Sequence, residues 1–211
     1  MRKGAVLTLA VVAAVTCAPI ASAGFVGFES TGAYINGKFV CRVYAKFDAD
    51  NFYVLSCFGI EGFAATDWND SDFASGSWDP KFSIDSTVDS YVTIGGAPGF
   101  TNSTAADPEW GAAGFNQPGI PNGAGWFNAN PSNFQGKVDG AFRTLIAQFV
   151  YPDPPMQGYA SPLSVSFNQG LGTPTQFAFF GVINVCIPAP GAVAMLAVAL
   201  FGSAVRRRRP A

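Results

Sequence analysis

The chain has 211 residues, of which 49% are hydrophobic, and its formal net charge is −2. This balance hides an acidic centre, because all 14 acidic residues but only six of the 12 basic residues lie between residues 24 and 188. The resulting charge of −8 argues against nucleic acid or an anionic membrane surface as a partner. The chain also contains no histidine, which excludes Ser–His and Cys–His catalytic pairs and most zinc sites.

The first 23 residues have the three parts of a secretory signal peptide. Arg2 and Lys3 form a basic start, and residues 5–15 are apolar apart from one threonine. Ala21-Ser22-Ala23 then provides the small residues of a cleavage site, so we expect the mature protein to begin at Gly24. An N-terminal membrane anchor is the alternative, although the apolar stretch is short for a membrane span.

The central part, residues 24–187, has the composition of an all-β domain. It is rich in Phe, Val, Gly, Ser and Asn and poor in Leu, Glu and Lys, which favours strands joined by turns over helices. We expect a single β-sandwich, jelly-roll-like, with a helix only at each chain end: the signal peptide and the C-terminal hydrophobic segment. No internal repeat and no second domain boundary is evident.

The first predicted unit is a hairpin made of residues 37–47 and 52–60, which are both rich in strand-forming residues. Asp48-Ala49-Asp50-Asn51 between them is typical of a turn. Folding the chain about Ala49 places Cys41 opposite Cys57 on the neighbouring strand, within reach of a disulfide bond. Two buried free thiols are the alternative interpretation. Cys186 is then left as a free thiol, an intermolecular bridge or a buried residue of the last strand.

The segment that follows is polar and contains a candidate metal site. Asp67, Asn69, Asp70 and Asp72 supply oxygen atoms at closely spaced positions, which suits a weak extracellular calcium site. The glycine and distal glutamate of an EF-hand are lacking, and solvated turns that cap backbone groups are the alternative. Apart from calcium, the sequence indicates no cofactor.

Further strands are predicted at residues 82–94, 141–151, 163–168 and 175–186. Residues 177–185 are nearly all apolar, which predicts a central strand covered on both faces. Between these strands, residues 100–136 form a long loop rich in Gly, Asn and Pro, whose Trp residues we expect to pin it to the sheet. Alternatively, exposed aromatic residues form a platform on which sugars stack, the candidates being Tyr53, Trp68, Trp78, Trp110 and Trp126.

The last residues have the pattern of a membrane stop. Pro188-Ala189-Pro190 precedes an apolar stretch from 192 to 205, which is followed by Arg206, Arg207, Arg208 and Arg209. The apolar stretch is near the lower limit for crossing a bilayer whose hydrocarbon core is about 30 Å thick. The arginines are expected to stay on the cytoplasmic side, because guanidinium groups cross lipid at high cost.

This tail resembles the PEP-CTERM sorting signal of bacterial surface proteins, which has a Pro-x-Pro motif, a short hydrophobic helix and terminal arginines. The resemblance covers residues 188–209, and it departs from the family in having Ala189 where Glu is usual. The signal peptide predicts handling by the Sec export machinery and signal peptidase, and the resemblance of the tail implies later handling by an exosortase-like transpeptidase. The resemblance also implies anchoring in the inner membrane, transient or permanent, on the way to the bacterial cell envelope, surface or exterior.

The sequence therefore favours an exported, non-enzymatic protein with a structural, adhesive or exopolysaccharide-associated role. A glycan-binding module is the first alternative, and exposed coplanar aromatic rings on one face would distinguish it. A carbohydrate-active enzyme with paired carboxylates is the second, and it would need two acidic side chains that converge in an open cleft.

Overall fold

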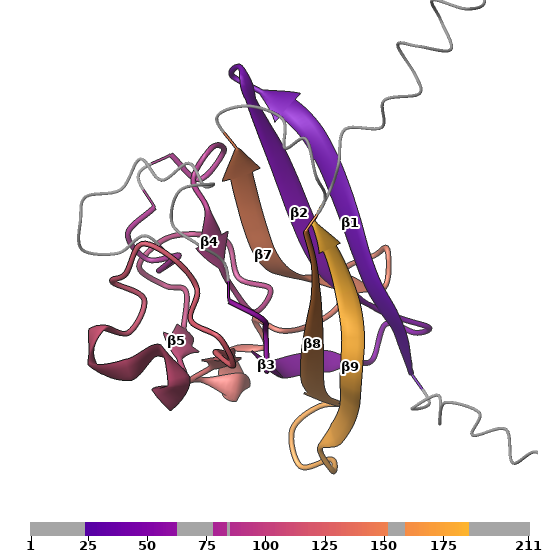
Figure 1. Cartoon of the computed structure of the whole chain (residues 1–211). Coiled ribbons are helices and arrows are strands. Elements are labelled where there is room, and N and C mark those ends of the chain that lie inside the picture. Colours follow the sequence, from indigo (N-terminus) through magenta and orange to yellow (C-terminus); the bar gives the residue numbers. More distant parts are fainter. Residues whose placement is uncertain (1–23, 63–77, 84, 152–158, 186–211) are drawn as a thin grey trace, which may run out of the picture.

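The computed structural model describes residues 24–62, 78–83, 85–151 and 159–185 (Figure 1). Within these ranges the chain forms nine strands and two short 3-10 helices, and no α-helix. The strands are β1 (Phe25–Ile35), β2 (Lys38–Phe47), β3 (Tyr53–Phe58), β4 (Tyr91–Val92), β5 (Thr104–Ala106), β6 (Trp126–Asn128), β7 (Arg143–Tyr151), β8 (Tyr159–Asn168) and β9 (Gln176–Val185). The 3-10 helices are η2 (Pro108–Ala113) and η3 (Pro131–Asn133).

The strands make two antiparallel sheets, which confirms the predicted all-β fold. The four-stranded sheet has the order β1-β2-β7-β4, and the five-stranded sheet has the order β5-β6-β3-β8-β9. Side chains from both sheets meet in one core, in which Val43 and Ile146 of the first sheet join Val165 and Phe167 of the second, all at most 1% exposed. The two helices predicted at the chain ends lie outside the described residues.

The β1–β2 hairpin owes its shape to Asn36 and Gly37. Both have positive φ angles, 49° and 78°, as a two-residue turn of type I′ requires. An Asn-Gly pair is the strongest short-range signal for such a hairpin, and the sequence predictions above overlooked it. The turn fixes the register in which Gly32 of β1 lies opposite Cys41 of β2.

The predicted hairpin between residues 37–47 and 52–60 is wrong. Both segments are strands, but β2 pairs with β1 and β7, whereas β3 pairs with β6 and β8 in the other sheet. The turn after Phe47 therefore carries the chain across the core instead of back along the same sheet. The alternation of apolar residues fits a hairpin within one sheet and equally fits two strands that face each other from different sheets. In both cases every second residue points into the core.

Strand β7 confirms the prediction of a buried strand at residues 141–151, since almost all of its residues are buried. The loop from 85 to 90 covers its outer side, where Gln148 Nε2 donates to the carbonyl oxygens of Ser86 and Asp89 at 3.0 and 2.8 Å. The strand predicted at residues 82–94 is reduced to β4, which pairs with the middle of β7.

The long loops between β4 and β7 are pinned by tryptophans, as expected. Trp110 and Trp126 are 2% and 1% exposed. Their indole N–H groups donate to the carbonyls of Gly125 and Thr93 at 2.6 and 3.0 Å. The rings therefore fill the core, and their polar edges fix the backbone of two loops.

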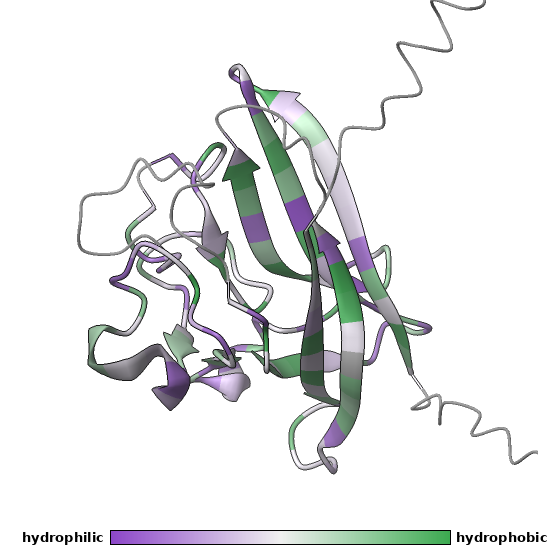
Figure 2. Cartoon of the chain, viewed as in Figure 1, coloured by the Kyte–Doolittle hydropathy of each residue, from purple (hydrophilic) through white to green (hydrophobic). Residues whose placement is uncertain are grey.

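Strand β9 contradicts the prediction of a central strand covered on both faces. It is the edge strand of the five-stranded sheet, next to β8 alone. Figure 2 shows hydrophobic residues along the strands of both sheets, and β9 carries several of them although one of its faces is uncovered. Phe177, Phe179 and Val182 are 50%, 61% and 53% exposed. The apolar residues of β9 thus lie on both faces of the strand, and only one of these faces packs against the core.

Candidate functional site

The outer face of the five-stranded sheet presents a row of residues that the strand register aligns. Ser56 of β3 lies opposite Phe127 of β6 on one side and Ser166 of β8 on the other, and Ser166 lies opposite Phe177 of β9. Directly paired residues of antiparallel strands share a face, so all four side chains are on the same side of the sheet. Trp126 and Val165, next to this row in sequence, point into the core. The row therefore lies on the outer surface.

Two phenylalanine rings at the β9 end of this row are exposed and nearly parallel. The ring centroids of Phe177 and Phe179 are 5.8 Å apart, and the ring planes differ by 16°. Phe58 of β3 packs against Phe179 edge to face at 6.2 Å. Toward β3 the face becomes polar, where the hydroxyls of Ser56 and Ser166 are 2.6 Å apart. We call Phe58, Phe127, Phe177 and Phe179 the aromatic face.

A small hollow lies beside the aromatic face, at the other end of β3. Its lining includes Tyr53, Leu55, Phe134, Asn168 and Leu171. The Tyr53 and Phe134 rings are 5.8 Å apart and tilted by 57°. Tyr53, one of the aromatic residues proposed for a sugar platform, lines this hollow.

The three described tryptophans do not form the sugar platform that was the alternative interpretation. Trp78, Trp110 and Trp126 are at most 2% exposed and belong to the core, because each large ring fills space between the sheets and the loops. Trp68 lies outside the described residues. On the outer face of the five-stranded sheet the exposed rings are phenylalanines. Two of them belong to β9, and the alternation of residues along this strand would have revealed them had it been recognised as an edge strand.

The candidate calcium ligands Asp67, Asn69, Asp70 and Asp72 also lie outside the described residues. In the ranges that the structure does describe, no group of three or more acidic or cysteine side chains is placed to hold a metal ion. The sorting residues Pro188, Ala189 and Pro190 and the four terminal arginines lie outside these ranges as well. None of the described segments is a helix long and apolar enough to cross a membrane.

The predicted disulfide between Cys41 and Cys57 is wrong. Cys57 is a free thiol, 1% exposed, and its burial raises its pKa. Cys41 is disulfide-bonded, but not to Cys57. The physical reason is the topology described above: β2 and β3 belong to different sheets, so the two cysteines are not neighbours on paired strands.

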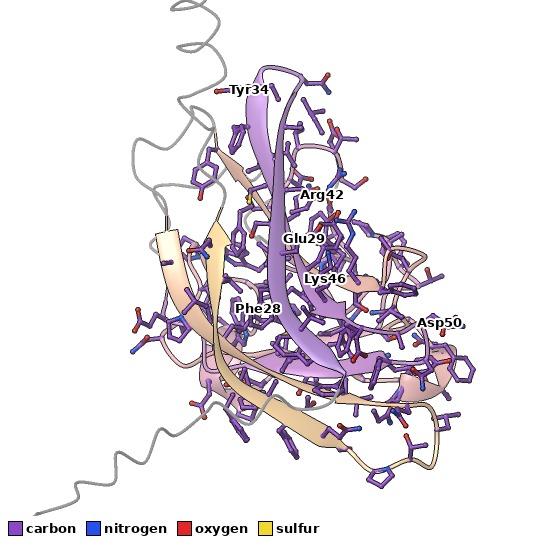
Figure 3. All side chains as sticks on the ribbon, turned by 90° about the vertical axis from the view of Figure 1, so that its right-hand side faces the viewer. Phe28, Glu29, Tyr34, Arg42, Lys46 and Asp50 are labelled. Atoms are coloured by element: carbon purple, nitrogen blue, oxygen red, sulfur yellow. The ribbon has the colours of Figure 1, made fainter. Side chains whose placement is uncertain are left out.

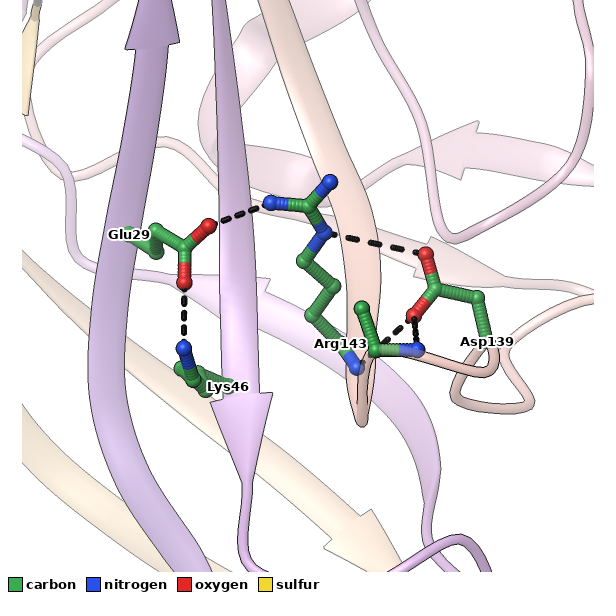
Figure 4. Close-up of polar contacts among 5 residues, drawn as sticks. Glu29, Lys46, Asp139 and Arg143 are labelled. Atoms are coloured by element: carbon green, nitrogen blue, oxygen red, sulfur yellow. Dashed lines mark hydrogen bonds and ion pairs between the residues drawn. The ribbon is translucent and has the colours of Figure 1, made fainter.

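A cluster of charged residues crosses the outer face of the other sheet (Figures 3 and 4). The Glu29 carboxylate accepts hydrogen bonds from Lys46 Nζ at 2.6 Å and from the Arg143 guanidinium. Arg143 also lies 4.1 Å from the centre of the Tyr44 ring. The bond from Lys46 is the largest of the effects that lower the pKa of Glu29. This cluster links β1, β2 and β7. Its charged residues are therefore explained by their contribution to the stability of the sheet.

Several other acidic side chains of the described part of the chain accept hydrogen bonds from backbone N–H groups. Asp89, fully buried, accepts from the Ser83 hydroxyl and the Asp85 backbone N–H, both at 2.9 Å. Asp107 accepts from the Glu109 N–H at the start of η2, and desolvation raises the pKa of Asp107. These contacts account for the positions of Asp89 and Asp107.

The chain was compared with known protein families, curated proteins and solved structures. No family model matches it, and no curated protein or solved structure is significantly similar to it. The aromatic face therefore has to be interpreted from its own geometry.

Proposed function

We propose that this protein is an exported bacterial surface protein whose β-sandwich attaches, without enzymatic activity, to uncharged polysaccharide. Export follows from the signal peptide at residues 1–23, with removal by signal peptidase after Ala23. The tail from 188 to 211 halts transfer in the inner membrane and is presented to an exosortase-like transpeptidase. We further propose that the sandwich is a jelly roll, a form supported by the nested pairing of β7 with β2 and β4 and of β3 with β6 and β8.

The observation that carries the adhesive role is the exposed, stacked pair of Phe177 and Phe179. The flat C–H faces of pyranose rings pack on aromatic rings, because this contact removes apolar surface of both partners from water. The two stacked rings stand on one paired strand and expose aromatic surface without prior rearrangement, so little conformational entropy is lost on binding. A third exposed ring, Phe127, extends the platform across the sheet.

The charge of the domain supports an uncharged ligand. The central part of the chain carries 14 acidic and six basic residues, so it repels anionic polysaccharides at low ionic strength. Stacking on phenylalanine requires no charge on the sugar. An uncharged glucan or a similar neutral polymer fits both properties of the surface.

The test uses the native protein isolated from the envelope of the cells that make it. Intact-mass measurement should give an N-terminus at Gly24 and should show whether the chain ends near Pro188. The same protein should be retained by neutral polysaccharide extracted from these cells. Retention of the full-length chain in the cytoplasm would overturn the proposal of export, and free passage of the mature protein through the polysaccharide would overturn the adhesive role.

A further inference from the structure

The chain contains two Asn-Gly pairs, Asn36-Gly37 and Asn122-Gly123, and all four residues are exposed. Asparagine is a chemically labile residue, and its side-chain amide is lost most readily when glycine follows. Glycine has no side chain to hinder the approach of its backbone nitrogen to the asparagine Cγ. The reaction requires this nitrogen to be free and the asparagine side chain to be free to turn toward it. The two pairs differ in both respects.

The Asn122-Gly123 pair is held on both sides of the bond that would form. The Gly123 N–H donates to the Ile60 carbonyl at 2.7 Å, and Asn122 Oδ1 accepts from the Gly62 N–H at 3.2 Å. The two segments also approach closely, because a Cβ added to Gly62 would lie 2.8 Å from the Asn122 backbone nitrogen. Attack by the Gly123 nitrogen would break both hydrogen bonds, so the fold opposes it.

The Asn36-Gly37 pair forms the tip of the β1–β2 hairpin and lacks both restraints. Among the residues that the structure describes, no acceptor binds the Gly37 N–H and no hydrogen bond holds the Asn36 side chain. Strand β2 pairs with β7 only from Phe39 onward, so the turn projects beyond the neighbouring strand (Figure 1). A Cβ added to Gly37 would meet no atom within 4 Å, so the space around this residue is open.

We propose that Asn36 is a site of spontaneous deamidation in the folded protein, whereas Asn122 is protected. The Gly37 nitrogen loses its proton to solvent and attacks Cγ of Asn36, and the side-chain nitrogen leaves as ammonia when the succinimide ring closes. Water then opens the ring. Breaking the new bond at Cγ gives aspartate, and breaking the bond at the main-chain carbonyl gives isoaspartate. The sum consumes one water and releases one ammonia, and nothing is oxidised or reduced.

The modification changes the tip of the hairpin. Both products carry a new carboxylate, and isoaspartate also lengthens the main chain by one atom. A two-residue turn of type I′ sets the register of its strands, so an extra backbone atom disturbs the residues beside it. Next to the turn the Tyr34 and Phe39 rings are 5.2 Å apart, and Ile35 packs on a buried cluster that includes Val40. The end of the hairpin therefore loosens as the protein ages, whatever the protein binds.

The test incubates the purified, folded protein in mildly alkaline buffer and follows both asparagines in one sample. Proteolytic peptides, prepared at acidic pH where the reaction is slow, are analysed by mass spectrometry. The peptide with Asn36 should gain about 1 Da, the difference between an amide and a carboxyl group, and should separate into two isomers. Asn122 should remain an amide. The same incubation in denaturant should modify both residues, because each glycine nitrogen is then free.

The matched variant is Asn36→Gly, because a Gly-Gly pair keeps a type I′ turn and has no side-chain amide. Its hairpin peptide should keep its mass. An Asn36 that stays unchanged in the folded protein but reacts in denaturant would overturn the proposal. Equal modification of Asn36 and Asn122 in the folded protein would also overturn it, since the hydrogen bonds at Asn122 would then give no protection. Failure of both residues to react in denaturant would overturn it as well.

Discussion

Removing the stacked rings of Phe177 and Phe179 is the most direct perturbation of the proposed polysaccharide-binding surface. An aromatic side chain presents about 150–250 Å², and Phe177 and Phe179 are 50% and 61% exposed. A flat sugar covers one side of each ring, which amounts to roughly 50–60 Å² per ring. At about 25 cal/mol per Å², each ring contributes about 1.3–1.5 kcal/mol, or roughly a tenfold change in the dissociation constant.

We therefore expect Phe177→Ala and Phe179→Ala each to weaken binding to neutral polysaccharide about tenfold, and the double variant to weaken it by up to about a hundredfold. The rings touch, so the two effects need not add fully. The measurement is affinity electrophoresis, in which the retardation of the native protein is followed as the concentration of a neutral polysaccharide in the gel increases.

A matched control is available in the same chain. Phe82 and Phe100 are also in contact and are 51% and 85% exposed, but their ring planes are perpendicular, at 89°. The double variant Phe82→Ala, Phe100→Ala removes similar exposed aromatic area outside the aromatic face and leaves the stacked pair in place, so it should bind as wild type does. Equal affinity of wild type and the Phe177→Ala, Phe179→Ala variant would refute the stacking argument, as would an equal loss in the control.

Two predictions concern the stability of the domain. In Gly136→Ala the new Cβ would lie 2.0 Å from the Val54 carbonyl oxygen, so β3 and the loop must move apart. This movement weakens the hydrogen bond from the Val54 N–H to the Gly136 carbonyl. We expect the free energy of unfolding, measured in urea, to fall by about 3 kcal/mol. Gly140→Ala, which meets no atom within 4 Å, is the control, and equal midpoints would contradict this placement of the loop. Because the pKa of Glu29 is lowered in the folded state, its contribution is present above the ordinary glutamate value and is lost as pH falls through the lowered one. Glu29→Gln should therefore cost about 1 kcal/mol or less at neutral pH and nothing in strong acid, whereas an unchanged difference across this range would argue against the ion pairs.

The positions of several strands were predictable from the sequence, but their neighbours were not. The apolar density of residues 143–151 and 163–168 reflects burial, which a sequence pattern reports directly. The sequence pattern of β2 and β3 does not show whether these strands pair or face each other across the core. Both arrangements need inward residues at alternate positions. The Asn36-Gly37 turn was a readable signal, since its positive φ angles require these residue types.

The aromatic residues of the candidate site were sought in the wrong segments for a related reason. Tryptophans in Gly-rich loops suggested a platform, but Trp110 and Trp126 have buried N–H groups that bond to loop carbonyls. A ring that positions a loop through its N–H group has to be buried beside that loop. Phenylalanine has no such group, so a phenylalanine ring on an already paired strand has no loop to position.

The surroundings of β9 also argue for a flat ligand over another strand as the partner of this surface. Edge strands attract other strands through unpaired backbone groups. At Asn184 the carbonyl that faces the edge already accepts a hydrogen bond from Ser30, and β1 runs beside β9. The rings of Phe177 and Phe179, by contrast, stand on the open face of the sheet, perpendicular to its backbone hydrogen bonds. What β9 offers is therefore a stacking surface with much of its edge covered, and this combination suits sugar rings better than strand addition by a protein.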